Sequence, residues 1–299
     1  MMFTPPKLSR EQPNTYAMQS ASGNEELKRL QLQDHMITVG MGGVLPELSD
    51  PARFQRVLDI GCGSGDWLLE TARTYPTISQ LIGVDVNPKM VNYARGRAKA
   101  LSLDGRVAFY RMDAMRRLEV PDASFDLVNE RFGASWLRTW DWPQFLYECQ
   151  RVLRPGGVLR VTEPRADMGG NSPALTRLAE LTIKAFYQAG NFFTLESGGI
   201  TGKLACLLRQ HGFQNVEAHA HVLEYRAGTP EGESFAEDYK HFYRALLPFL
   251  HKWTRVPDDY RGIYQQMLHE MQQPDFVARW TLLTAWGTKS PTFSLPREY

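Results

Sequence analysis

A strand that runs into a glycine-rich loop and then into a helix constrains the fold of this chain more than any other feature. Residues 57–67 read Val-Leu-Asp-Ile-Gly-Cys-Gly-Ser-Gly-Asp-Trp, with glycine at the alternate positions Gly61, Gly63 and Gly65. Glycine at such positions lets the backbone turn sharply and approach a ligand with no Cβ in the way. The segment therefore predicts a ligand-binding loop at the carboxyl end of a buried strand.

The residue after the last glycine distinguishes between two kinds of ligand. A dinucleotide-binding loop has its third glycine one position later, where this chain has Asp66. Asp59 and Asp66 bracket the loop, and two carboxylates repel a pyrophosphate but attract an ammonium or sulfonium group. We therefore expect a cationic ligand, and a nicotinamide-dependent enzyme is the disfavoured alternative.

Short apolar strands alternate with helical stretches between Arg56 and Glu163. The expected strands are 56–60, 80–84, 107–110, 125–129 and 158–163, and the expected helices are 67–75, 88–101 and 142–153. Asn87 before Pro88 is a typical helix start, with a capping side chain followed by proline at the first helical position. The alternation predicts an α/β fold with a Rossmann-like, doubly wound, mainly parallel sheet.

The segments on either side of this region are expected to add helices and to complete the sheet. Helical patterns cover 24–48, 173–188, 202–211, 235–253 and 259–272, and strand patterns cover 216–225 and 278–287. We expect residues 1–50 to form an N-terminal arm and helical lid, 51–170 the binding core, and 171–299 cap helices with the last strands of the sheet.

Composition excludes several function classes. Lys plus Arg number 34 and Asp plus Glu 33, for a formal net charge of +1, which argues against a general nucleic-acid binder. The three cysteines are far apart, so we expect neither a disulfide framework nor a metal site. No signal peptide and no apolar run of membrane-spanning length is apparent. We therefore expect a cytoplasmic protein without a membrane partner.

Four segments, in this order, resemble those of the class I S-adenosylmethionine-dependent methyltransferases. They are the glycine loop, Gly83-Val84-Asp85-Val86, the Phe125–Arg131 stretch and the Arg151–Gly157 turn, and Asp113-Ala114 matches a further acidic position. The resemblance covers about residues 56–163. It implies a seven-stranded, mainly parallel sheet with S-adenosyl-L-methionine as the cofactor of the binding core.

The resemblance also implies which residues hold the cofactor. Asp85 corresponds to the acidic residue that holds both ribose hydroxyls, and Asp113 to the one that meets the adenine amino group. The Glu26–His35 helix is similar to the leading helix of small-molecule methyltransferases akin to fungal secondary-metabolism regulators, which implies that it covers the cofactor. The implied cofactor-binding residues are Tyr16, Arg29, Asp59, Gly61, Cys62, Gly63, Gly65, Asp85, Val86, Met112, Asp113, Ala114, Asn129, Glu130 and Arg131.

Aromatic residues after the fourth and fifth strands predict where an acceptor binds. Trp136, Phe186 and Phe193 are expected at the carboxyl edge of the sheet, where doubly wound proteins bind ligands, and would line an apolar pocket. We favour methyl transfer to a small, largely apolar metabolite by in-line displacement. A general base is needed only if the acceptor is a hydroxyl or an acidic carbon, and Glu163 and His35 are the candidates. The alternative is a cofactor-binding protein of the same fold that acts as a regulator or catalyses cyclisation or rearrangement.

Overall fold

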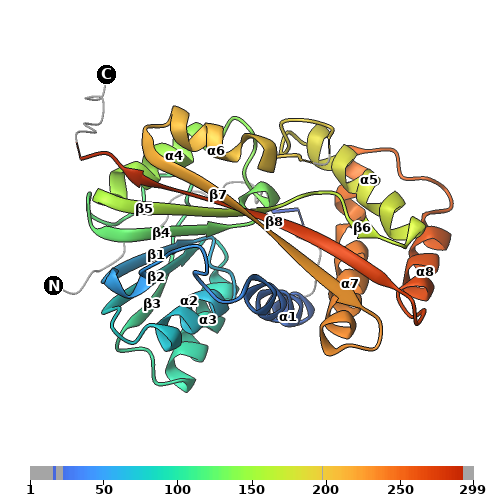
Figure 1. Ribbon diagram of the computed structural model, residues 1–299, viewed down its shortest axis with the longest axis horizontal. Coiled ribbons are helices and arrows are strands. Elements are labelled where there is room, and N and C mark those ends of the chain that lie inside the picture. Colours follow the sequence, from blue (N-terminus) through green and yellow to red (C-terminus); the bar gives the residue numbers. More distant parts are fainter. Residues whose placement is uncertain (1–15, 18–22, 197, 292–299) are drawn as a thin grey trace.

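One mostly parallel sheet organises the protein (Figure 1). The computed structural model describes residues 16–17, 23–196 and 198–291. Within these residues, eight strands join in the order β3-β2-β1-β4-β5-β8-β6, and β7 pairs with the other edge of β8. The strands are β1 (Arg56–Ile60), β2 (Gln80–Asp85), β3 (Val107–Arg111), β4 (Phe125–Arg131), β5 (Leu153–Pro164), β6 (Gly169–Gly170), β7 (Phe213–Arg226) and β8 (Val277–Lys289).

The strand directions confirm the expected doubly wound arrangement. β1 to β5 are mutually parallel, whereas β8 is antiparallel to both β5 and β7. The expected seven strands are all present, and the structure adds β6, a two-residue strand that pairs with β8 at Ala278 and Arg279. β1 and β4 are buried along almost their whole length, which explains why they appear in the sequence as unbroken apolar runs.

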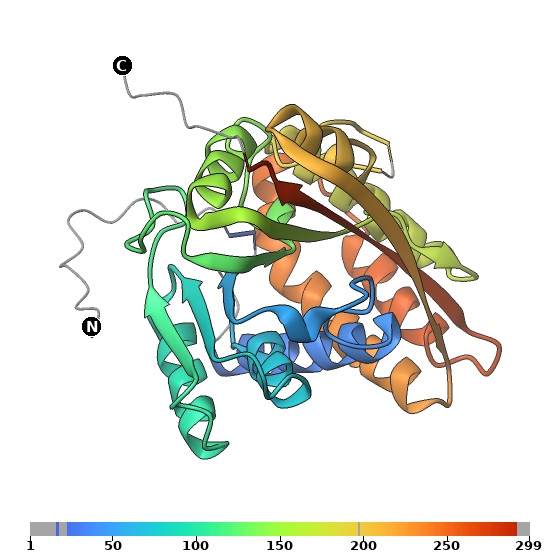
Figure 2. The same ribbon diagram turned by 60° about the vertical axis from the view of Figure 1, so that its left-hand side comes forward.

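Helices cover both faces of the sheet and gather at its carboxyl end. They are α1 (Gly23–Met41), α2 (Asp66–Thr74), α3 (Pro88–Ala100), α4 (Trp142–Val152), α5 (Pro173–Gln188), α6 (Thr201–Gln210), α7 (Pro230–Trp253) and α8 (Tyr260–Glu270), with the short 3₁₀ helices η1 (Pro51–Arg53) and η2 (Gly133–Ser135). Figures 1 and 2 show α2 and α3 on one face and α4 and α6 on the other, while α5, α7 and α8 pack together beside the far ends of β7 and β8.

The predicted helix starts lie within one residue of the observed ones, except that of α7. The Asn87 side chain accepts a hydrogen bond from the Lys89 backbone N, with Pro88 at the first helical position. Helix α1 ends at Met41, before Gly42, whose φ of 86° only glycine adopts readily. Helix α7 begins before the first predicted residue, because Thr229 caps it by accepting from the Gly232 backbone N.

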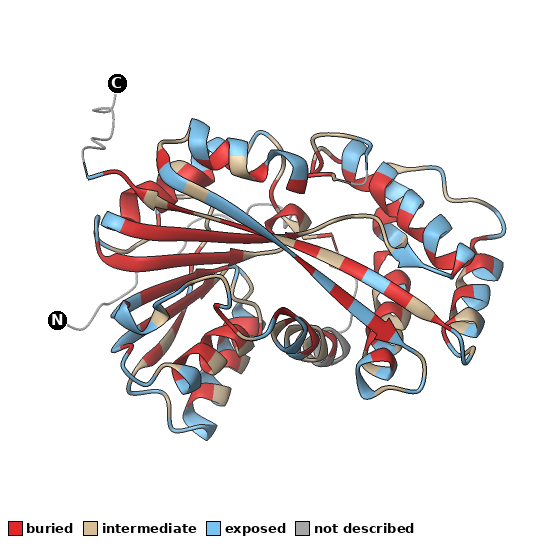
Figure 3. Ribbon diagram, viewed as in Figure 1, coloured by how far each residue is buried: buried red, intermediate tan, exposed pale blue. Residues whose placement is uncertain are grey.

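Two apolar clusters hold the layers together, and Figure 3 shows buried residues along the strands and on the helices that pack against them. The larger cluster joins α1, α4, α5 and α7 to the sheet, and the smaller joins α2 and α3 to β1 and β2. A buried ion pair between Arg29 and Asp238, 3.1 Å long, ties α1 to α7. The N-terminal helix is therefore fastened over the carboxyl end of the sheet. The expected arm, residues 1–22, lies outside the described residues except for Tyr16 and Ala17.

In the part of the chain that the structure describes, none of the helices has the length and apolar character that crossing a membrane requires.

Candidate functional site

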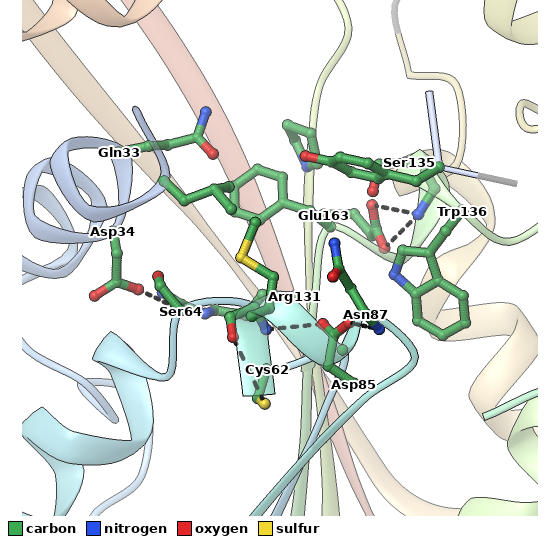
Figure 4. A pocket seen from close by; sticks show the side chains of 18 of the residues that line it. Gln33, Asp34, Cys62, Ser64, Asp85, Asn87, Arg131, Ser135, Trp136 and Glu163 are labelled. Carbon is green, nitrogen blue, oxygen red and sulfur yellow. Dashed lines mark hydrogen bonds and ion pairs between the residues drawn. The ribbon is translucent and has the colours of Figure 1, made fainter. Parts of the chain in front are cut away.

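A cavity of about 1060 Å³ opens at the carboxyl ends of β1, β2, β4 and β5. One part of its wall is polar and comes from the glycine loop and the ends of β2 and β3. The other part is aromatic and comes from η2, α5, α7 and β8. Figure 4 shows Glu163 beside Ser135 and Trp136, with Asp85 and Cys62 below them in the view.

The glycine loop has the conformation that its sequence predicts. Gly61, Gly63 and Gly65 all have positive φ, at 71°, 51° and 79°. A Cβ on Gly65 would lie 2.6 Å from the Phe109 ring and 2.9 Å from the Cβ of Ala94, so this position also has no room for a side chain. The loop is therefore determined by backbone conformation and by close packing together.

Asp85 connects the glycine loop to the start of the next helix. Its carboxylate accepts hydrogen bonds from the Gly63 backbone N at 3.0 Å and from the Asn87 backbone N at 2.8 Å. Burial raises the pKa of Asp85, whereas the two backbone N–H groups oppose that shift. Asp113 has a similar position after β3, where it accepts from the Met115 backbone N at 2.9 Å and pairs with Arg116 at 3.5 Å.

Asp59 ends a chain of buried polar contacts behind the glycine loop. It accepts from the Asn129 side chain at 2.7 Å, and Asn129 accepts in turn from Arg160 at 2.8 Å. Arg160 pairs with Glu47 at 3.0 Å, and the Nε2 atom of His221 lies 2.8 Å from the same carboxylate. Burial raises the pKa of Asp59 to about 7, while the charge of Arg131 and the hydrogen bond from Asn129 act in the opposite direction.

Side chains from α1 and α7 complete the polar wall. Arg131 pairs with Asp34 of α1, and its guanidinium lies 5.8 Å from the centre of the Trp67 ring. Arg29 donates to Asp238 at 3.1 Å and to the hydroxyl of Tyr16 at 3.4 Å. Helix α1 therefore contributes both charges and hydrogen-bond donors to the cavity.

The aromatic part of the wall reaches the glycine loop through Trp136. A Cβ on Gly61 would lie 3.4 Å from the Nε1 atom of Trp136, so the indole lies directly against the loop. Beyond it the wall is largely aromatic or apolar. Its residues of this kind are Phe132, Trp136, Met168, Phe186, Phe192, Tyr239, Phe242, Tyr243 and Trp280.

Glu163 is a buried carboxyl group on the wall of this cavity. Its oxygens accept from the Ala134 backbone N at 3.1 and 3.3 Å, and a backbone hydrogen bond from Gly133 adds to these (Figure 4). Burial nevertheless raises the pKa of Glu163 to about 8. A carboxyl group with a pKa near neutrality is suited to accepting a proton from a bound molecule.

Comparison with known proteins agrees with this geometry. The family model of a methyltransferase domain matches residues 57–157. The demethylmenaquinone methyltransferase of Lactiplantibacillus plantarum is 32% identical over 170 residues, which cover 54% of this chain and 70% of that protein. The chain belongs to the S-adenosylmethionine-dependent methyltransferases.

Two further comparisons extend over more of the chain. The 27-O-demethylrifamycin SV methyltransferase of Amycolatopsis mediterranei is 26% identical over 256 residues, which cover 85% of this methyltransferase and 78% of that protein. The solved structure of phosphoethanolamine N-methyltransferase 2 from Haemonchus contortus superposes with a TM-score of 0.56 at 19% identity, covering 91% of this chain and 59% of that one. The structural likeness shows the fold.

The polar part of the cavity fits the cofactor of the family, S-adenosyl-L-methionine. Asp59, Asp85 and Asp113 lie on its wall. Carboxylates attract a sulfonium group and accept hydrogen bonds from hydroxyl and amino groups, all of which the cofactor carries. The backbone of Gly61 and Gly63 leaves that part of the wall without side chains. The acidic side chains favour a cationic ligand, and the glycines let that ligand approach the backbone closely.

Most of the predicted site residues of the methyltransferase line the cavity together. They are Tyr16, Arg29, Asp59, Gly61, Cys62, Gly63, Asp85, Val86, Met112, Asp113, Ala114, Arg131, Trp136, Glu163 and Phe186. The others are not part of the wall: Gly65, Asn129, Glu130, Phe193 and His35. Asn129 and Glu130 are fully buried behind it, and His35 is exposed on α1. Gly65 shapes the loop through its conformation.

Several lining residues were not among the predictions. They are Gln33 and Asp34 of α1, Ser135, Arg165, Thr182, Asp238, Tyr239, Tyr243 and Trp280. The apolar periodicity of 235–253 indicated a packed helix but not which of its residues would face a ligand. The sequence signal that could have identified one of them is Asp238, a charged residue within an otherwise apolar periodic pattern.

Proposed function

We propose that this enzyme transfers the methyl group of S-adenosyl-L-methionine to a small, largely apolar acceptor by in-line displacement. The observation that carries the proposal is that one cavity contains both a polar, acidic part beside the glycine loop and an aromatic part beyond Trp136. Such a cavity can hold a cationic methyl donor and an apolar acceptor next to each other. Positioning and exclusion of water then supply much of the rate.

The proposed cofactor contacts are those of the polar wall. We assign the ribose hydroxyls to Asp85 and the adenine amino group to Asp113, and the methionine end to the neighbourhood of Asp59 and Arg131. Tyr16 and Arg29 would cover this end from the N-terminal side. The ion pair of Arg29 with Asp238 supports this, since it holds α1 over the cavity.

Glu163 is the proposed general base. Cofactor binding supplies a methyl group on a positively charged sulfur, so the acceptor must provide the electron pair. Where the acceptor atom is a hydroxyl oxygen or an acidic carbon, its proton must leave as the new bond forms. The Glu163 carboxylate lines the cavity and can take that proton, whereas the other candidate, His35, is exposed and does not line it.

A panel of paired acceptors tests the proposal. Phenols, enols and hydroquinones with apolar substituents would be compared with the same compounds blocked as methyl ethers, and with small polar amines. We expect release of S-adenosylhomocysteine with the unblocked apolar compounds alone. Turnover confined to the polar amines would contradict the apolar assignment. Binding of the cofactor with no turnover across a broad panel would favour a regulator or a cyclisation catalyst of the same fold.

A further inference from the structure

Two buried glutamates lie side by side where β4 and β5 reach the cavity. Glu130 and Glu163 are both 0% exposed, and their carboxyl groups lie at the same turn after β4, Glu130 against Gly133 and Glu163 against Ala134. The strands that carry them are neighbours, with Glu130 opposite Val161 and Arg131 opposite Thr162. Glu163 lines the cavity, whereas Glu130 lies behind it.

The hydrogen-bond donors around the pair are distributed unequally. Glu163 accepts from the backbone N–H groups of Ala134 and Gly133. Neither oxygen of Glu130 has a hydrogen-bond partner among the described residues. Its carboxyl group lies against Gly133, and the Glu163 carboxyl is a neighbouring charge. Two ionised carboxylates offer no donor to each other, so a buried contact of this kind needs a proton.

The loop between the two strands holds this arrangement in place. A Cβ on Gly133 would lie 2.7 Å from the Oε1 atom of Glu130, so a larger residue there would displace the carboxyl. Phe132, the preceding residue, has a φ of 64°, in the left-handed region that side chains other than glycine rarely adopt. Strained backbone of this kind occurs where a site requires one geometry.

We propose that Glu130 is a positioning residue for Glu163 and that its carboxyl group stays protonated. This proposal rests on the proposed role of Glu163 as general base. In this arrangement the Glu130 carboxyl O–H donates to the Glu163 carboxylate, holds it toward the cavity and leaves it as the ionised member of the pair. The methyl–sulfur bond breaks with its electron pair left on sulfur while the bond from the acceptor atom to the methyl carbon forms. The acceptor proton moves to Glu163 and is lost to solvent after the product leaves.

The charges around the pair agree with this assignment. Burial, the neighbouring Glu163 and Asp59 all raise the pKa of Glu130, and only Arg131 and the Gly133 backbone oppose them. The Cys149 thiol, which α4 places near Glu130, is also neutral because burial raises its pKa. The hydrogen bond from Glu130 lowers the pKa of Glu163 and so favours its ionised form. A proton on Glu130 therefore makes Glu163 the better base.

Two substitutions of Glu130 test the proposal through the pH profile. Glu130→Leu removes the donor, so we expect kcat to fall about 100-fold, as for impaired general-base catalysis, and the rise of kcat with pH to move to higher pH. Glu130→Gln keeps a neutral donor of the same shape. We expect it to recover most of the activity that Glu130→Leu loses and to leave the midpoint of the pH profile within about half a pH unit of wild type.

The opposite outcome for Glu130→Gln would overturn the proposal. If Glu130 were ionised, removing its charge would lower the pKa of Glu163 and move the rise of kcat to lower pH. Equal losses in both variants with an unshifted profile would also contradict it, since a merely structural role gives that result. Titration with S-adenosylhomocysteine should give the wild-type Kd for both variants, which shows that they fold and bind. Asp104→Asn, an exposed carboxylate, is the matched control.

An infrared difference spectrum separates this proposal from the proposed function. A buried protonated carboxyl has a C=O band distinct from that of a carboxylate. Above about pH 9, where Glu163 is ionised, we expect the wild-type band to contain a component that is absent from Glu130→Gln and retained in Asp104→Asn. The spectrum needs no acceptor. A Glu130→Gln spectrum identical to that of the wild type would therefore refute the proton on Glu130 even if the acceptor were wrongly assigned. Loss of the component would support that proton even if no methyl transfer were found.

Discussion

At the scale of single residues, burial and hydrogen bonding act on Glu163 in opposite directions. Burial raises the pKa of Glu163 to about 8, while the backbone N–H groups of Ala134 and Gly133 stabilise its ionised form. A general base acts when it is deprotonated. Its contribution should therefore be small below pH 7 and nearly complete above pH 9, roughly one unit on each side of the pKa.

Substitution of Glu163 by Gln tests this at the residue scale. The change keeps the size of the side chain but removes the proton acceptor, so we expect kcat to fall by about 10²- to 10⁴-fold. The rise of activity between pH 7 and pH 9 should disappear with it. Steady-state rates of S-adenosylhomocysteine formation across this pH range measure both effects. Unchanged kcat with the same pH profile would show that Glu163 takes no proton.

The residues that could be predicted individually were those marked by a local pattern. Asp85 ends β2 and Asp113 lies two residues after β3, so their place at the carboxyl edge of a parallel sheet follows from the sequence. Glu130 was assigned to the same wall as Arg131, but successive side chains of a strand point to opposite faces. Only Arg131 of the two lines the cavity. Which of two neighbouring strand residues faces a ligand depends on the face of the sheet to which each side chain points. The sequence motif does not specify that face.

At the scale of elements, the glycine loop depends on the backbone of β1 and α2. Gly65→Ala should destabilise the protein, because φ there is 79° and the new Cβ would lie 2.6 Å from the Phe109 ring. We expect a loss of about 1–3 kcal/mol in the free energy of unfolding, from overpacking together with backbone strain. Denaturant unfolding measures it.

The matched control for this prediction is Gly96→Ala in α3. Gly96 lies within a helix and a Cβ there would have nothing within 4 Å, so the same substitution should stabilise the protein by about 0.5–1 kcal/mol. Opposite signs for the two variants support the account of the loop. Stabilisation in both would mean that Gly65 is free to take a side chain.

Most elements could be predicted because local patterns specify their starts and ends. The start of α3 follows from Asn87 and Pro88, whereas α1 ends at Met41, seven residues before the end of the predicted helix. β5 begins at Leu153 rather than Val158, because Leu153 already pairs with Phe125 of β4 before the register shifts and Val158 pairs with Leu127. Irregular pairing of this kind arises from tertiary contacts, which alternation of apolar residues does not report.

At the scale of the whole molecule, the cavity is assembled from segments that are far apart in the sequence. Helix α1 contributes Asp34 and Arg29, α7 contributes Asp238 and Tyr239, and β8 contributes Trp280. The buried ion pair between Arg29 and Asp238 joins residues 209 positions apart. The sequence predicted the polar part of the site because one continuous segment forms it. Of the acceptor part it predicted Trp136 and Phe186 but not Tyr239 and Trp280, whose place in the wall depends on how α7 and β8 pack.

A calorimetric titration of the wild type and of Asp85→Ala with S-adenosylmethionine tests the central claim most directly, with NAD as the control ligand and Asp104→Ala as the control variant. Asp85 faces the cavity and holds the glycine loop through the Gly63 backbone N. We expect the wild type and Asp104→Ala to bind S-adenosylmethionine alike and NAD not at all. Affinity should fall about 10- to 100-fold in Asp85→Ala, the effect of losing one or two hydrogen bonds to a charged group. Equal affinity in Asp85→Ala, or binding of NAD, would contradict the assignment of this cavity.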